Sequence, residues 1–385
     1  MTPVRRYAAA IAAIVTSTAG LMAGSGMFAE AAAASATFTG PLNTITTLAS
    51  TVPANGDVNP YGVAVVPRST GHLHQGSVLV SNFNDQANIQ GTGTTIVQVT
   101  PGGHRSLFAR VGNLGGACPG GVGLTTALSV LRSGWVIVGS LPTQQQNGTT
   151  VVSGAGCLIV LDSHGAVRET FTGHGINGPW DMTALDLGGI AELFVTNVLN
   201  GTVAAGGSPV NGGTVLRLVI TAVGTPRLLN VTRIGSGFPE TLNNAALVIG
   251  PTGVGLAANG TLYVADTLDN RIAGIPNAAF RFKDDGPGFT VSDGGALNSE
   301  LGLAVAPNGD ILTVNGGDGN MVETTPGGTQ VAVKTVDNNQ GGAGNLFGLA
   351  VKPGADAVYF VDDFGGGPDN NPPAQNNLQL FFQRL

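Results

Sequence analysis

Short apolar runs of four to seven residues recur along the chain, and turns rich in Gly, Pro, Asn and Asp separate them. Runs of three kinds follow one another in the same order, and this order repeats six times. None of the runs has the 3.6-residue period of an amphipathic helix. Short strands bounded by turn residues, with a repeat about every 45 to 70 residues, are typical of β-propeller blades.

The six copies can be aligned on one position near the start of the first run. The first runs are NPYGVAV (59–65), CPGGVGL (118–124), GPWDMTA (178–184), GPTGVGL (250–256), SELGLAV (299–305) and NLFGLAV (345–351). Their aligned anchor residues are Gly62, Gly121, Asp181, Gly253, Gly302 and Gly348. The second runs end at Asn82, Ser140, Asn197, Asp266, Asn315 and Asp362, and the third runs are TTIVQV, CLIVLD, TVLRLV, RIAGI, NMVETT and NLQLFF. We therefore predict an all-β, six-bladed propeller, in which the anchor glycines let backbones approach closely at the axis.

The two ends of the chain complement each other. The last copy stops one strand short, after 378–382, whereas 43–49 is a spare strand ahead of the first copy. Pairing the two removes the free edge of an open array. We therefore expect the N-terminal strand to complete the last blade.

The first 36 residues have the pattern of an export signal. Arg5 and Arg6 precede an apolar stretch at 8–15, and Ala34 and Ala36 form a small-residue cleavage site. Polar residues interrupt the stretch too often for a membrane span. We expect a signal peptide at 1–36 and a single propeller domain at 37–385. The mature chain should be monomeric, without a membrane anchor, and secreted or periplasmic by an export route left open.

Composition limits the partners. The net charge is -7 and only three lysines are present, so the chain lacks the cationic face that nucleic acids require. Charged residues make up 10% of the chain, well below the usual share of about 25%. A surface of Ser, Thr, Asn and Gly follows, and we expect no nucleic-acid binding.

The fourth copy resembles an NHL repeat. The matching residues are Pro251-x-Gly253-Val254, the strand 262–267 and the turn 269–272. The resemblance implies a six-bladed propeller used chiefly as a binding platform, and less often as an enzyme. The expected partner is an unknown protein, peptide, glycan or small molecule, and no cofactor is predicted.

An enzyme is the alternative. The chain lacks the common hydrolase, metalloprotease, nucleotidase and redox motifs, so no catalytic residue is assigned. Tyr263-x-x-Asp266-Thr267 is similar to a segment of the calcium-dependent gluconolactonase and paraoxonase propellers, which implies a lactonase or lyase with Ca²⁺. The residues before the six anchors include no Asn, which that family places there, and 177–179 matches its Glu-Gly-Pro only with Asn for Glu. The metal ligands therefore stay unknown.

One rim of the propeller carries the predicted site. In each blade the first strand begins and the second strand ends at the same rim. The predicted ligand-binding residues there are Asn59, Asn82, Trp180, Asp181, Asn197, Asp266, Asn315 and Asp362. A polar ring around an aromatic residue is typical of a binding site, but Asn and Asp also end strands through backbone hydrogen bonds. Both interpretations stay open. The first predicts that replacing Trp180 or Asp181 with alanine removes binding and leaves the melting temperature nearly unchanged.

Cys118 and Cys157 are the only cysteines, and an exported chain favours a disulfide between them. The predicted blade opposes this bond, because its first and third strands lie about 10 Å apart, beyond the Cα separation of about 7 Å that a disulfide spans. We nevertheless expect the disulfide on redox grounds.

The histidines give weaker signals. His72 and His74 could present two imidazoles to a metal, but without an identifiable third ligand we interpret them as a solvated turn. His164 is interpreted as a turn residue, and His174 lies nearest the predicted rim. The Asp- and Asn-rich run 362–371 does not follow EF-hand spacing and is interpreted as a solvated insertion.

Overall fold

The computed structural model describes residues 36–112, 114–147, 149–243, 246–338, 346–364 and 375–385. The predicted signal peptide therefore lies almost entirely outside the described residues, as does most of the run 362–371. Residues 37–385 form one compact unit. No helix in the described part of the chain is long and apolar enough to cross a membrane.

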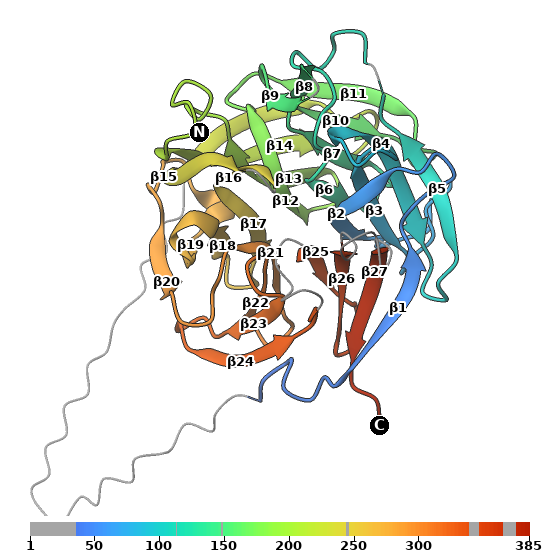
Figure 1. Cartoon of the computed structure of the whole chain (residues 1–385). Coiled ribbons are helices and arrows are strands. Elements are labelled where there is room, and N and C mark those ends of the chain that lie inside the picture. The colour runs from blue at the N-terminus through green and yellow to red at the C-terminus, as the bar shows by residue number, and fades with distance from the viewer. Residues whose placement is uncertain (1–35, 113, 148, 244–245, 339–345, 365–374) are drawn as a thin grey trace, which may run out of the picture. The chain divides into compact units, whose positions relative to one another are not determined.

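Six antiparallel sheets surround a common axis, so the predicted six-bladed propeller is confirmed (Figure 1). The inner strands are β2 (Val58–Val65), β6 (Leu128–Val130), β12 (Gly178–Asp186), β17 (Pro251–Leu256), β21 (Glu300–Val305) and β25 (Leu346–Val351). The second strands are β3 (Val78–Asn84), β7 (Val136–Ser140), β13 (Ile190–Val198), β18 (Leu262–Asp266), β22 (Ile311–Asn315) and β26 (Ala357–Phe364). The third strands are β4 (Gln90–Val99), β10 (Cys157–Leu161), β14 (Val210–Thr221), β19 (Arg271–Ile275), β23 (Asn320–Thr324) and β27 (Gln375–Phe382).

Each blade ends in an outer strand, and a few short elements lie outside the four-stranded pattern of the blades. The outer strands are β5 (Arg105–Arg110), β11 (Val167–Thr172), β15 (Leu228–Asn243), β20 (Phe289–Asp293), β24 (Gln330–Thr335) and β1 (Thr44–Ser50). The additional elements are β8 (Thr143–Gln146), β9 (Thr149–Val152), β16 (Leu247–Ile249), and the 3₁₀ turns η1 (Thr267–Asp269) and η2 (Ala278–Phe280). Strand β1 pairs with β27, which confirms that the N-terminal strand completes the last blade.

The core lies between neighbouring blades. Second strands such as β3, β7, β18 and β22 are buried along their whole length because a blade packs against each face. At the first interface, Leu79 and Ile96 of one blade meet Val138 and Ile159 of the next. Apolar side chains on both faces of a strand thus stabilise two interfaces at once.

The anchor glycines allow close contact between inner strands. A Cβ atom on Gly348 would lie 2.1 Å from the carbonyl oxygen of Tyr61, and one on Gly302 would lie 2.2 Å from that of Phe347. Any larger residue would therefore push neighbouring blades apart. The predicted role is confirmed for Gly62, Gly253, Gly302 and Gly348.

The prediction for the second blade is wrong at its first strand. Gly121 lies in an exposed loop with φ of +83°, and a Cβ atom there would meet no neighbour within 4 Å. The inner strand β6 begins seven residues later, and Thr126 is the residue that lies against Gly62. Glycine at 121 serves a left-handed turn, which mimics the pattern of an anchor.

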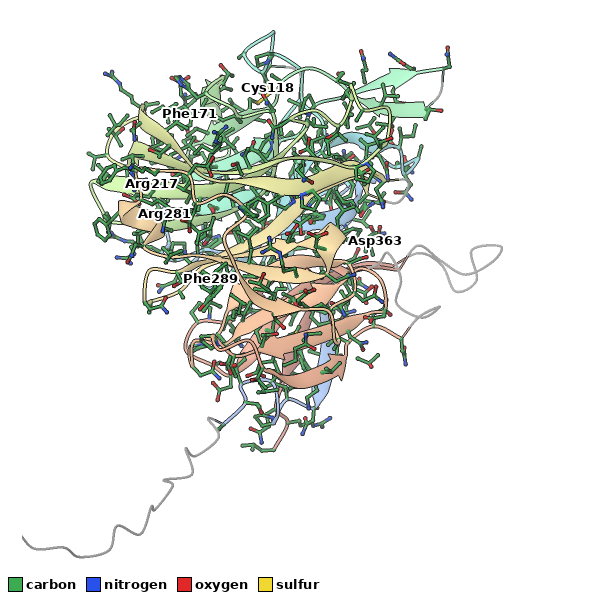
Figure 2. All side chains as sticks on the ribbon, turned by 90° about the vertical axis from the view of Figure 1, so that its left-hand side faces the viewer. Cys118, Phe171, Arg217, Arg281, Phe289 and Asp363 are labelled. Carbon is green, nitrogen blue, oxygen red and sulfur yellow. A yellow bond between two sulfur atoms is a disulfide. The ribbon has the colours of Figure 1, made fainter. Side chains whose placement is uncertain are left out.

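The late start of the inner strand β6 also explains how the disulfide can form. Cys118 lies in the loop before β6, where Ala117 accepts a hydrogen bond from Thr170 of the outer strand β11. Cys118 and Cys157 are bonded, with a Cα separation of 5.4 Å (Figure 2). The disulfide is therefore confirmed, and the geometric objection fails because Cys118 is not in an inner strand. A disulfide fits an oxidising compartment.

Candidate functional site in the central channel

The six inner strands surround a cavity of about 360 Å³ on the propeller axis. Each inner strand is the edge of its sheet, so its unpaired backbone groups face this channel. The side chains around it are mostly small or aliphatic, such as Val63, Val65, Leu256 and Val305. The channel therefore combines exposed backbone hydrogen-bonding groups with small and aliphatic side chains.

Asp181 is the only ionisable residue among the described residues that line the channel. It occupies the anchor position of the third blade, where four other blades have glycine. Its carboxylate accepts hydrogen bonds from the backbone N–H groups of Met182 (2.7 Å) and Val254 (3.2 Å). Burial raises the pKa of Asp181 to about 7, although both hydrogen bonds oppose the shift. The carboxyl group can therefore gain or lose a proton near neutral pH.

An aromatic cluster packs behind Asp181, on the side where the inner strands begin. We call Tyr61, Phe83, Trp180 and Phe347 the aromatic plug. The ring centroid of Tyr61 lies 5.6 Å from that of Trp180 and 5.1 Å from that of Phe347. Burial and the nearby charge of Asp181 raise the pKa of Tyr61 well above its usual value. Three of its members, Tyr61, Trp180 and Phe347, directly precede the anchor position of their inner strands, toward the rim predicted as the functional face.

Trp180→Phe should lower the free energy of unfolding by about 2 kcal/mol, because the smaller ring leaves a cavity in the plug. Trp180 is only 1% exposed, so its truncation has a folding cost, contrary to the melting temperature that the sequence predicted to stay nearly unchanged. Urea unfolding would measure this loss. Trp135→Phe is the control, since Trp135 is only partly buried; equal losses for both variants would contradict the assigned role of the plug.

Five of the other predicted site residues lie on the second strands, one strand further from the axis, and Asn59 lies near the start of the inner strand β2. Asn82 pairs with Pro60, Asn197 with Pro179, and Asp362 with Leu346. The six residues Asn59, Asn82, Asn197, Asp266, Asn315 and Asp362 are buried and do not line the channel. The structure thus brings only Trp180 and Asp181 together at the axis. A ligand-binding role for the other six stays a prediction.

The side chains of Asn82 and Asn315 form hydrogen bonds with the segment that precedes their own blade. The Asn82 amide donates to the carbonyl of Thr51, and the Asn315 amide donates to that of Ala296. Asn315 also donates to Asp318. Only the contact with Asp318 is the local turn chemistry that the sequence left open as an alternative.

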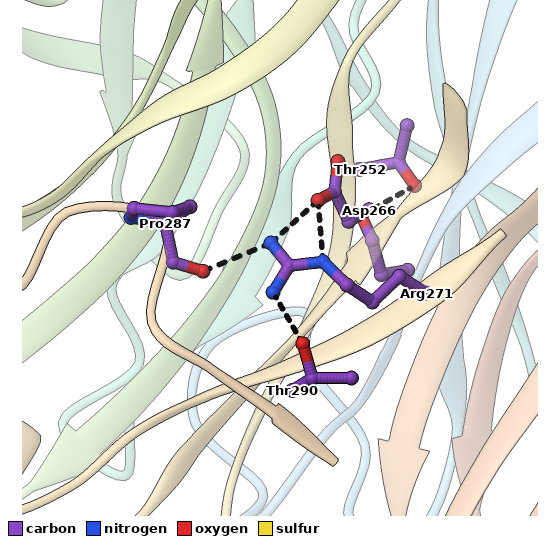
Figure 3. Close-up of polar contacts among 6 residues, drawn as sticks. Thr252, Asp266, Arg271, Pro287 and Thr290 are labelled. Carbon is purple, nitrogen blue, oxygen red and sulfur yellow. Dashed lines mark hydrogen bonds and ion pairs between the residues drawn. The ribbon is translucent and has the colours of Figure 1, made fainter. Parts of the chain in front are cut away.

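Asp266 forms a buried ion pair. Arg271 contacts its Oδ2 at 2.7 Å and also donates to Pro287 and Thr290 (Figure 3). Burial raises the pKa of Asp266 to about 6, while Arg271 opposes the shift. The nearby Glu300 is buried, and burial, with the charge of Asp266, raises its pKa to about 9. Glu300 was missed from the sequence, although it stands where three other inner strands have proline.

The donor set at the axis does not fit calcium. Calcium takes about six to eight oxygen ligands, several of them carboxylates. The residues directly before the anchor position are Tyr61, Thr126, Trp180, Thr252, Leu301 and Phe347, and all are buried. At the anchor position of the third blade, Asp181 provides a single carboxylate to the channel. In the described ranges, no group of three or more His, Cys, Asp or Glu residues is arranged to hold a metal ion.

A second, larger groove lies between the β8–β9 hairpin and the β15–β16 hairpin, with a volume of about 610 Å³. Gln144, Thr150, Val203 and Leu242 line it, and none of its described lining residues is ionisable. The groove is large, but none of its described lining residues is charged, so we consider it the weaker candidate for the functional site.

Solved structures with the same fold are similar to this chain at low identity. A calcium-binding protein, regucalcin, from Agrobacterium tumefaciens is 13% identical, with a TM-score of 0.53 over 87% of this chain and 97% of that one. A gluconolactonase from Xanthomonas campestris is 13% identical, with a TM-score of 0.53 over 90% and 91%. A streptogramin B lyase is 13% identical, with a TM-score of 0.51 over 89% and 98%.

These similarities show the propeller fold. No family model matches the chain, and no curated protein matches it. The resemblance to NHL repeats is therefore not shown beyond the six-bladed architecture. The structural neighbours instead belong to the gluconolactonase and regucalcin group and to related lyases.

Proposed function

We propose that this protein is exported and binds a small molecule in its central channel, with Asp181 contacting the polar end of the ligand. The position of Asp181 carries the proposal, because among the described lining residues it is the one ionisable group in a cavity otherwise lined by backbone groups and small or aliphatic side chains. A pocket with apolar walls and few convergent polar groups is the usual form of a small-molecule site. The favoured ligand is a small ammonium compound with an apolar body.

An isosteric probe series tests this ligand class. Cyclohexylammonium, cyclohexanol and cyclohexanecarboxylate share one ring and differ in charge. We expect the ammonium probe to bind at least about tenfold more tightly than the alcohol, since a charge-assisted hydrogen bond is stronger than a neutral one. The carboxylate should bind weakest. Isothermal titration calorimetry measures all three.

Asp181→Asn should remove the preference for the ammonium probe while keeping the shape of the side chain. In the wild type, affinity should rise with pH until about pH 7 and then level off, because only ionised Asp181 attracts the cation. Asp356→Asn, at an exposed position in the loop between β25 and β26, is the control. If Leu242→Gln weakens binding and Asp181→Asn does not, the ligand site is the groove between the two hairpins.

A lactonase or lyase is the second candidate. The pKa of Asp181, raised to about 7 by burial, suits a general base at neutral pH. The gluconolactonase and the streptogramin B lyase with this fold support the candidate as analogies only. Asp181 would take a proton from a water molecule that attacks a lactone carbonyl, and would return the proton to the ring oxygen as the carbon–oxygen bond of the lactone breaks. Hydrolysis of a δ-lactone in a pH-stat, lost in Asp181→Asn, would favour this candidate over simple binding.

A further inference from the structure

Two histidines from neighbouring blades lie side by side on the surface. His72 is in the loop between β2 and β3 of the first blade, and His164 is in the turn between β10 and β11 of the second. Their ring centroids are 4.8 Å apart, with an angle of 75° between the ring planes. Both residues are exposed. In the sequence the two histidines lie in separate turns, and the packing of the first two blades brings their rings together.

Backbone contacts hold the two loops together. The N–H of His72 donates to the carbonyl oxygen of Ser163 at 2.8 Å. Gly71 has φ of +58°, and a Cβ atom there would lie 2.4 Å from the hydroxyl oxygen of Ser163. Glycine is needed for both the left-handed backbone and the close approach. The fold therefore fixes the backbones of the two loops relative to each other.

We propose that His72 and His164 together bind one divalent transition-metal ion of the class that prefers imidazole, such as Zn²⁺, Ni²⁺ or Cu²⁺. With metal–nitrogen bonds of about 2.1 Å, two imidazoles on one tetrahedral ion have ring centroids about 5 Å apart. The observed 4.8 Å matches this separation. The torsion that turns a histidine ring has a broad minimum, so exposed rings can aim a nitrogen at a shared ion.

The other ligands of the ion would be water. The nearest carboxylate in the turn, Asp162, is already engaged: its Oδ1 accepts from the N–H groups of His164 and Ala166, and its Oδ2 pairs with Arg168 at 2.6 Å. A site with two imidazoles and exchangeable waters binds metal with modest affinity. Bound metal would also link the first and second blades across their interface.

Calorimetric titration of metal-free, tag-free protein with ZnCl₂ and NiCl₂ tests the site. We expect one equivalent to bind at about pH 7.5, and we expect His72→Asn or His164→Asn to weaken binding at least about tenfold, because each removes one ligand. His174→Asn is the matched control, since His174 is exposed and lies outside the pair. Wild-type binding by both His72→Asn and His164→Asn would overturn the proposal.

A spectroscopic readout locates the ion independently of affinity. The chain has five histidines, and their ring proton signals can be assigned with the single variants. Substoichiometric Ni²⁺ should broaden the signals of His72 and His164 first. Selective broadening of other histidines, with these two unaffected, would contradict the site. Because both residues are exposed, circular dichroism of the metal-free variants should match the wild type and confirm that they fold.

Discussion

Glu300→Gln should stabilise the protein at alkaline pH, by on the order of 5 kcal/mol at pH 8. Burial raises the pKa of Glu300 from 4.5 to about 9, so the folded state keeps a proton that the unfolded state releases. A raised carboxyl pKa lowers stability as pH rises from the unfolded pKa to the folded pKa, by about 1.4 kcal/mol per pH unit. Glutamine resembles the protonated acid and does not titrate, so the variant avoids this loss.

Urea unfolding of both proteins between about pH 4 and pH 9 measures the effect. The difference in unfolding free energy should be small near pH 4 and should grow with pH up to about 9. Glu169→Gln is the control, because Glu169 is exposed. A difference that does not change with pH would show that Glu300 is already ionised in the folded protein.

Replacing both Cys118 and Cys157 with alanine should lower the free energy of unfolding by about 4 kcal/mol. The disulfide closes a loop with a sequence separation of 39 residues, and loop-closure entropy of the unfolded chain gives this magnitude. The bond also fixes the loop before β6 against the third strand of its blade. Differential scanning calorimetry under non-reducing conditions measures the loss.

Reduced wild-type protein provides the comparison for the disulfide. It should lose about the same stability as the double variant, because both lack the cross-link. A change below about 1 kcal/mol in both proteins would contradict a stabilising role. The second blade would then be held by its β-sheet contacts alone.

Local pattern was sufficient to predict most of the fold. Apolar runs between turn residues located five of the six inner strands, because each strand is short and each turn needs Gly, Pro, Asn or Asp. The second blade failed, since Gly121 satisfies a left-handed turn and not a close approach at the axis. One residue type serves both purposes, so sequence alone could not separate them.

Long-range contacts limited the prediction of the site. Asn82 and Asn315 lie at the predicted rim, but their amides bind carbonyls of the segment that precedes their own blade, 31 and 19 residues earlier in the chain. His72 and His164 became neighbours only through the packing of two blades. Asp181 was identified because it replaces the glycine found at the anchor position of other copies. This replacement is visible in the sequence without knowledge of long-range contacts.

The ¹³C NMR signal of the Asp181 carboxyl group, followed against pH with and without cyclohexylammonium, tests the proposed channel site most directly. We predict a pKa of about 7 in the free protein, because the group is buried in the channel. The ammonium probe should lower this pKa by stabilising the carboxylate. A carboxyl group that titrates near its ordinary value of 3.8 and does not respond to the probe would contradict the proposal.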